Sequence, residues 1–277
     1  MPVPRVANHM ICTVKIGEEW IFMDGTHPLI PFGIPPESLQ GKEAMISISD
    51  KEYKIITVPH SVPSTNKVID TSYLKINGRQ IVGKIKLHLQ GHPSWSTQVA
   101  LMYRKNKVRE EYIKAILERG SNKYIQRSYE YSPSDTGTKP CVIAADFVLD
   151  DFAHVLGNEY YINLNLSLRN YFDNNYIDTT ERDIPEYFGY MDTEREVVVV
   201  DIPDGYHVSY MPPQSSGQVS NIWDYNINYT QDGKRVILSK EYTVHSMTMP
   251  TRYFAEHNRA VNALKKQYKE RIVLTAN

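Results

Sequence analysis

Two turn dipeptides separate runs of alternating polar and apolar residues in this chain. Asn77-Gly78 lies between residues 72–76 and 80–90, and Asp232-Gly233 separates two later runs of the same kind. Asn-Gly and Asp-Gly supply the positive φ angles that a two-residue hairpin turn requires, and alternation places apolar side chains on one face of a strand. The sequence therefore predicts antiparallel hairpins and a fold that consists mainly of β-strands.

Other segments add strands and two helices to this prediction. Apolar residues recur at helical spacing over 97–119, after a capping Ser96, and again over 251–268, after Pro250. The remaining strand-like runs are 44–48, 53–58, 124–131, 141–149, 160–168, 196–200, 207–211, 225–230, 236–244 and 272–274. We expect a mainly β (α+β) protein whose larger part is an antiparallel β-sandwich-like domain with two helices.

Proline-rich segments indicate where regular structure stops. The stretch from Pro28 to Ser38 contains four prolines and predicts a rigid loop. Pro59 and Pro63, followed by Ser64 and Asn66, indicate a boundary near residue 60. The expected organisation is a short part over 1–60 and a β domain over 61–277.

Composition limits the classes of partner. With 31 basic and 32 acidic residues the formal net charge is −1, so no overall field attracts nucleic acid. No apolar run is long enough to span a membrane, and residues 1–5 lack the pattern of a signal peptide. The two cysteines, Cys12 and Cys141, have no zinc or redox spacing, and we expect both to be buried as small apolar residues.

Residues 8–26 predict a hairpin that brings a histidine and an aspartate together. A two-residue loop at Gly17-Glu18 places Asp24 opposite Ile11, and His9 then lies diagonal to Asp24 on the same face. A three-residue loop without a bulge would place the two side chains on opposite faces. Cys12, at an odd offset from His9, points the other way and is poorly placed as its nucleophile.

Such a pair suits nucleophilic catalysis. A carboxylate that fixes the orientation of an imidazole lets the histidine take a proton from a thiol and later give it to a leaving amine. A surface histidine beside a turn-flanking aspartate has the same sequence pattern, so the pattern alone does not decide between the two readings.

A family resemblance favours the catalytic reading. Asn8-His9-Met10-Ile11, Gly17, Trp20 and Met23-Asp24-Gly25-Thr26 resemble the His and Asp strands of the transglutaminase-like superfamily. The loop with Pro31-Phe32-Gly33, and the segment from Pro36 to Ala44, are similar to bacterial envelope members of that superfamily. The resemblance implies His9 as general base and acid, Asp24 as its orienting group, no cofactor or metal, and a periplasmic or envelope location.

The chain departs from the family pattern in one important respect. In the family the catalytic cysteine precedes the histidine and lies at a helix N-terminus, which lowers its pKa. Only eight residues precede His9 here, and Cys141 lies in what we expect to be a buried strand. We therefore expect the thiol to lie upstream, and the chain to be inactive without that missing half of the core.

The region from about residue 68 is similar to the uncharacterised C-terminal β domain of such proteins. The similar features are Asn77-Gly78, Gly83, the helix after Ser96, Arg182-Asp183-Ile184-Pro185, Phe188-Gly189-Tyr190 and Pro203-Asp204-Gly205-Tyr206. An alternative from another class is a non-catalytic interaction or carbohydrate-binding module, because the chain's 20 tyrosines suit binding surfaces. Peptide, protein or glycan substrates are the expected partners. A metal site at His88 and His92 is disfavoured by Gly91 and Pro93.

Overall fold

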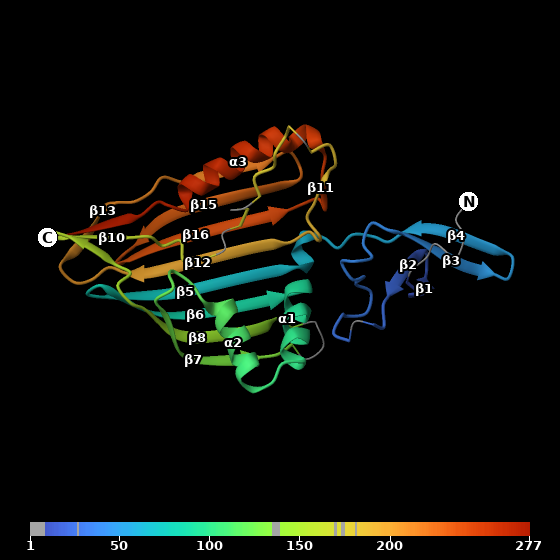
Figure 1. The fold of residues 1–277 in the computed structure, drawn as a ribbon, viewed down its shortest axis with the longest axis horizontal. Coiled ribbons are helices and arrows are strands. Elements are labelled where there is room, and N and C mark those ends of the chain that lie inside the picture. Colours follow the sequence, from blue (N-terminus) through green and yellow to red (C-terminus); the bar gives the residue numbers. More distant parts are fainter. Residues whose placement is uncertain (1–8, 27, 135–138, 169–170, 173–174, 181) are drawn as a thin grey trace.

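The structure is a computed structural model that describes residues 9–26, 28–134, 139–168, 171–172, 175–180 and 182–277. Asn8 of the predicted hairpin, and the first five residues examined for a signal peptide, lie outside these ranges. The fold is mainly β with helices, as predicted, and Figure 1 shows a large twisted sheet with two hairpins beside it. No helix among the described residues is long and apolar enough to cross a membrane.

The first part of the chain consists of two hairpins joined by the proline-rich loop. β1 (Cys12–Ile16) pairs with β2 (Glu19–Met23), and β3 (Glu43–Ser49) pairs with β4 (Glu52–Thr57). Phe22, Ile46 and Val58 are buried together in a small apolar cluster of their own. The boundary that the sequence predicts near residue 60 falls between this cluster and the large core that follows.

The rest of the chain is organised around an eight-stranded sheet. In spatial order its strands are β14 (Ser215–Val219), β15 (Trp223–Asp232), β16 (Arg235–Val244), β12 (Thr193–Asp201), β5 (Lys67–Asn77), β6 (Gln80–Gln90), β8 (Cys141–Leu149) and β7 (Tyr124–Ser132). All neighbouring pairs are antiparallel except β12 and β5. The hairpins predicted at Asn77-Gly78 and Asp232-Gly233 are confirmed, with Asn77 opposite Gln80 and Asp232 opposite Arg235.

A smaller sheet and three helices complete the core. The smaller sheet has the order β13 (Tyr206–Tyr210), β18 (Ile272–Ala276), β10 (Glu159–Ile162) and β9 (His154–Leu156), and β11 (Glu186–Tyr187) pairs with β17 (Thr248–Met249). The helices are α1 (His92–Met102), α2 (Asn106–Leu117) and α3 (Phe254–Gln267), with short 3-10 turns at Pro63–Thr65 and Thr251–Tyr253. Both sheets and the helices contribute to one hydrophobic cluster. The sandwich-like architecture therefore rests on a single shared core.

Strand alternation decides which face of the large sheet is covered. In β6, Ile81, Ile85 and Leu87 are at most 5% exposed, whereas Lys84 and Lys86 between them are exposed. β8 repeats the pattern, with every second residue from Cys141 to Leu149 in the core. The opposite face carries the charged Lys84, Lys86 and Asp146 among apolar residues such as Val82 and Ala144, and it forms an outer surface of the molecule.

The predicted helix over 97–119 was wrong in its bounds, because the segment forms two helices. α1 begins five residues earlier than expected, with Pro93 in the first turn, where a missing N–H costs nothing. The side chain of Asn66 accepts a hydrogen bond from the N–H of His92 at 2.9 Å. The helix stops at Met102, and Asn106 begins α2 with a φ of +47°. The helix predicted over 251–268 is confirmed in position.

The strand predicted over 160–168 is only partly present. β10 ends at Ile162, and the side chain of Asn163 accepts a hydrogen bond from the N–H of Asn165 at 2.7 Å, a local bond that replaces strand pairing. Leu164 and Leu166 are both fully buried, which explains the strand-like pattern of the sequence. The short strands β9, β11, β14 and β17 were not predicted.

Charged side chains are buried in the core face of the large sheet. Lys240 and Glu196, opposite each other on β16 and β12, form an ion pair of 2.7 Å with side chains 3% and 7% exposed. Ser167 donates a hydrogen bond to the same Glu196 carboxylate at 2.7 Å. Arg119 and Asp70 form a second pair beside it, at 2.5 Å. These groups make the stability of the core depend on charge.

Glu194 makes stability depend on pH. Burial, together with the neighbouring acids Asp192 and Glu196, raises the pKa of Glu194 to about 8, and burial raises that of Asp192 to about 6. The folded state therefore keeps a proton that the unfolded chain has lost above its ordinary pKa near 4.5. Unfolding releases that proton, so the free energy of unfolding should fall as pH rises from about 5 to about 8.

We expect Glu194→Gln to flatten this dependence. The amide cannot ionise, so the variant should be more stable than wild type near pH 8, by on the order of 2–3 kcal/mol. Urea denaturation at pH 5.5 and pH 8 measures the difference. Glu241→Gln, on an exposed position of β16, is the matched control and should keep the wild-type slope. An unchanged slope in Glu194→Gln would show that other groups cause it.

Candidate functional site

The register of the first hairpin brings His9 and Asp24 together. Ile16 is paired with Glu19 and Cys12 with Met23, so the loop is Gly17-Glu18, and Gly17 has a φ of +60°. The two-residue loop that the sequence predicted is therefore confirmed. Two residues separate His9 from the start of β1, and Asp24 directly follows the end of β2. Both lie at the open end of the hairpin, on the face that carries Phe22.

The two side chains are in direct contact. His9 Nε2 lies 2.7 Å from Asp24 Oδ2, the distance of a strong hydrogen bond. The Asp24 side chain is 2% exposed, whereas the His9 side chain is 38% exposed. A shielded carboxylate thus holds an imidazole that solvent can reach.

A turn fixes the carboxylate. The N–H and the hydroxyl of Thr26 both donate hydrogen bonds to Asp24 Oδ1, at 3.0 and 2.7 Å. Burial acts to raise the pKa of Asp24, but the hydrogen bonds from Thr26 and His9 outweigh it and hold the pKa below its ordinary value. Asp24 is therefore ionised at neutral pH and suited to orienting a histidine.

We expect the loss of His9 to raise the pKa of Asp24. His9→Ala removes one hydrogen bond and the nearby imidazole, both of which lower that pKa. A titration of the ¹³C carboxyl signals measures the change. Asp24 should titrate at higher pH in His9→Ala than in wild type, and Thr26→Val should also raise its pKa because it removes the hydroxyl that donates to the carboxylate. Identical titration curves in wild type and His9→Ala would contradict the contact.

Neither cysteine is placed to act with His9. Cys12 is exposed, and its register position puts it on the opposite face of the hairpin from Phe22 and Asp24. The expectation that Cys12 is buried was wrong, because that face of β1 has no cover among the described residues. Cys141 is fully buried in β8, as expected, and burial raises the pKa of its thiol to about 11. A thiol with that pKa is inert at neutral pH.

A second histidine–aspartate pair lies in the β domain and was not predicted. His245 Nε2 is 2.5 Å from Asp224 Oδ2, and the two side chains are 42% and 43% exposed. The β15–β16 register places Asp224 opposite Thr243, so His245 is its diagonal neighbour. The signal was present in the sequence, because the Asp232-Gly233 turn fixes that register. Unlike Asp24, this carboxylate is open to solvent, so the pair is a natural control for the first.

The hairpins meet the β domain through further histidines. His92 pairs with Glu37 at 3.1 Å, and His60 Nδ1 lies 2.7 Å from the sulfur of Met247. The imidazole of His60 lies so close to Gly41 that a Cβ there would come within 2.6 Å of it, and the φ of Gly41 is +75°. A hollow of about 400 Å³ lies at this junction, lined by Gln40, Gly41, Lys42, His60, Tyr187, Met191, His245, Ser246, Met247 and Thr248.

Among the described residues, no group of three or more His, Cys, Asp or Glu side chains is arranged to hold an ion. His88 lies on β6 and His92 begins α1, so the two do not share one helical face.

Comparison with known proteins concerns the β domain alone. Residues 158–274 match the model of a family described as a domain of unknown function with a solved structure, DUF3858. The match runs from the start of β10 into β18, so it leaves out strands β1 to β9 and helices α1 and α2. No curated protein matches the chain.

Proposed function

We propose that His9 and Asp24 are the general base and the orienting carboxylate of a transglutaminase-like thiol amidase site. The observation that carries the proposal is the 2.7 Å contact between an accessible imidazole and a carboxylate that is 2% exposed and fixed by Thr26. The resemblance of the hairpin sequence to the His and Asp strands of that superfamily supports it. The thiol must be one other than Cys12 and Cys141.

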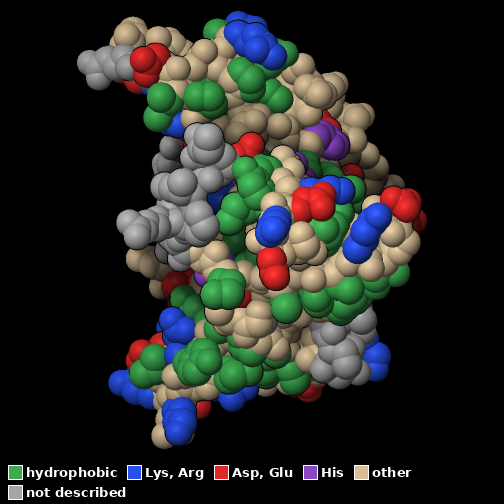
Figure 2. All heavy atoms as spheres, turned by 90° about the vertical axis from the view of Figure 1, so that its right-hand side faces the viewer, with side chains coloured by type: hydrophobic (Ala, Val, Ile, Leu, Met, Phe, Trp, Pro, Cys, Tyr) green, Lys and Arg blue, Asp and Glu red, His purple; other side chains and the backbone are tan. Residues whose placement is uncertain are grey.

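Exposed apolar side chains on the two N-terminal hairpins support the proposal that a further part of the protein packs against this site. Met10 is 90% exposed, Phe32 66% and Ile16 54%, and Met45 and Ile55, paired on β3 and β4, are 42% and 39% exposed. Figure 2 looks onto this side of the molecule and shows hydrophobic side chains at its surface. An apolar surface on so small a part is typical of a contact region. It suits the remainder of a catalytic core that carries the thiol.

The chemistry follows from the pair. His9 takes the proton of the thiol, and the thiolate attacks the amide carbonyl to give a tetrahedral intermediate. The protonated imidazole then gives its proton to the departing amine, and a thioester remains. Water or a second amine attacks the thioester, with His9 again as base, and releases the thiol. Asp24 stays ionised throughout and stabilises the imidazolium.

The proposal predicts that activity depends on a missing thiol. We expect the 277-residue chain to neither hydrolyse a glutamine peptide nor incorporate an amine into it. A longer protein, which includes the in-frame segment encoded upstream and a cysteine that opens a helix, should do one or both. Ammonia release and incorporation of a fluorescent amine measure the two reactions. Turnover by the 277 residues alone, or an upstream segment without a cysteine, would count against the proposal.

A further inference from the structure

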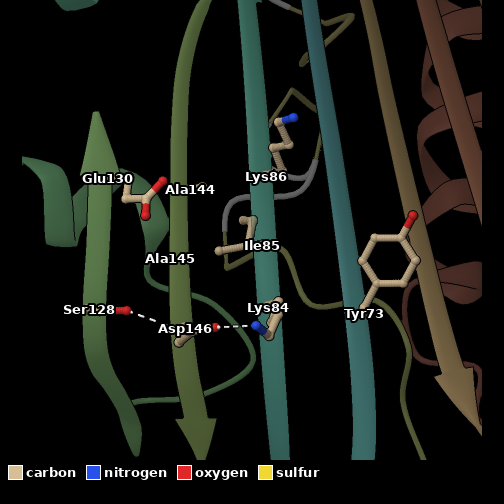
Figure 3. Close-up of a pocket in the computed structure, with 9 residues that line it drawn as sticks. All are labelled: Tyr73, Lys84, Ile85, Lys86, Ser128, Glu130, Ala144, Ala145 and Asp146. Atoms are coloured by element: carbon tan, nitrogen blue, oxygen red, sulfur yellow. Dashed lines mark hydrogen bonds and ion pairs between the residues drawn. The ribbon is translucent and has the colours of Figure 1, made fainter. Parts of the chain in front are cut away.

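The outer face of the large sheet has a hollow that the proposed amidase does not use. It occupies about 320 Å³ and lies over strands β5, β6, β8 and β7 (Figure 3). That volume is at the lower end of the range for small-molecule sites, roughly 300–1,000 Å³. The side chains that rise around it are Tyr73, Lys84, Lys86, Ser128, Glu130 and Asp146, with Ala144 between them.

The hollow arises from one short side chain in a row of long ones. Ala144 on β8 is paired with Lys86 on one side and with Glu130 on the other. The methyl group leaves a gap between an exposed ammonium group and an exposed carboxylate. Within the described ranges, neither the Lys86 nor the Glu130 side chain has a hydrogen-bond or ion-pair partner. Figure 3 shows both standing apart, on opposite sides of the gap.

The neighbouring row supplies an aromatic ring and a fixed carboxylate. Tyr73, Lys84, Asp146 and Ser128 follow one another across the four strands. Asp146 accepts a hydrogen bond from Ser128 at 3.1 Å and lies 3.5 Å from the Lys84 ammonium group. Tyr73 is 54% exposed. Figure 3 views the sheet face-on and the Tyr73 ring face-on as well, so the ring lies roughly parallel to the sheet.

We propose that this hollow binds a neutral saccharide chain. A flat, exposed ring offers its face to the C–H groups of one sugar unit, and the free hydrogen-bonding groups across the hollow suit the hydroxyls of neighbouring units. Lys86 can donate to a hydroxyl on one side of the gap while Glu130 accepts from a hydroxyl on the other. The two basic and two acidic side chains cancel in charge, which disfavours an anionic or a cationic ligand. The open shape suits an extended chain better than an enclosed small molecule.

Titration of the ¹⁵N-labelled 277-residue chain with cellohexaose, maltohexaose and N-acetylchitohexaose tests the proposal. At least one hexasaccharide should shift the amide signals of residues 84–86 and 144–146. Tyr73→Ala removes the stacking face and should weaken binding about tenfold or more. Ala144→Leu fills the gap and should abolish binding. Lys86→Met and Glu130→Gln each remove one hydrogen bond and should weaken it about two- to tenfold.

The matched control is Tyr53→Ala. Tyr53 lies on β4 and is 53% exposed, close to the exposure of Tyr73, but it belongs to the separate two-stranded sheet of β3 and β4 and does not line the hollow. This variant should bind as wild type does. Three results would each overturn the proposal: no shift with any of the three sugars, undiminished binding by both Tyr73→Ala and Ala144→Leu, or heparin binding at residues 84–86 in place of the neutral sugars.

Discussion

Replacement of His9 by alanine in the longer, thiol-containing protein is expected to lower kcat/KM by roughly 10²- to 10⁴-fold, the usual contribution of a general acid–base group. The imidazole performs the proton transfers of both halves of the proposed reaction, acylation and thioester cleavage, so its loss affects every chemical step. Asp24→Asn should lower the rate by less, because the carboxylate orients and stabilises the imidazole and takes no proton itself. Initial rates of ammonia release from a glutamine peptide measure both effects.

The second histidine–aspartate pair provides the control for this experiment. His245→Ala and Asp224→Asn remove a contact of similar length in the β domain, where both side chains are more than 40% exposed. These variants should keep the wild-type rate. A His9→Ala protein as active as wild type, with its fold intact, would refute the assignment. A loss in His245→Ala as large as that in His9→Ala would move the site to the β domain.

The second large effect concerns stability. Lys240→Ala leaves the carboxylate of Glu196 buried without its ion-pair partner, and the loss of one member of a buried pair typically costs about 3–5 kcal/mol. Burial acts to raise the pKa of Glu196, but Lys240 outweighs it and keeps that pKa below its ordinary value. The variant should therefore be strongly destabilised at neutral pH and recover part of the loss as Glu196 is protonated in acid.

Thermal unfolding of Lys240→Ala and of the double variant Lys240→Met with Glu196→Leu measures this effect. The double variant removes both charges and should be far more stable than the single one. Lys234→Ala is the control, because its ion pair with Asp204 lies at the surface, with side chains 79% and 94% exposed. It should leave the unfolding midpoint unchanged. Equal midpoints for Lys234→Ala and Lys240→Ala would contradict a structural role for the buried pair.

The pairing of hairpin strands could be predicted where the two residues of the turn themselves determine the loop length. Asn77-Gly78, Asp232-Gly233 and Gly17-Glu18 each fix a two-residue loop, and the loop fixes the register of the whole hairpin. The contact between His9 and Asp24 could be predicted for that reason, because it depends on one turn and on strand periodicity alone. The same reasoning, applied to Asp232-Gly233, would have found the pair of His245 and Asp224.

Features that depend on distant residues could not be predicted. β14 has the sequence Ser215-Ser216-Gly217-Gln218-Val219, which has no apolar alternation, and it is a strand because β15 pairs with it. The early start of α1 depends on a hydrogen bond from the N–H of His92 to the side chain of Asn66, which is 26 residues away. The buried pair of Glu196 and Lys240 joins two strands that are not consecutive hairpin partners in the sequence. Each of these features is tertiary in origin.

The exposed face of β1 shows another limit of predicting burial from the sequence. Cys12 was expected to be buried from its residue type, yet type alone does not say which face of a strand is covered. The register, by contrast, correctly placed Cys12 on the face opposite Asp24.

The pH dependence of thiol alkylation tests the assignment of His9 without the need to know the substrate. Iodoacetamide reacts with the thiolate, and an unperturbed cysteine has a pKa near 8.5, which a neighbouring imidazolium lowers. The longer protein should therefore be alkylated at its proposed nucleophile with a midpoint well below pH 8, and His9→Ala should move that midpoint upward, toward the value of an unperturbed cysteine. The same midpoint in wild type and His9→Ala would mean that this histidine does not act on the thiol.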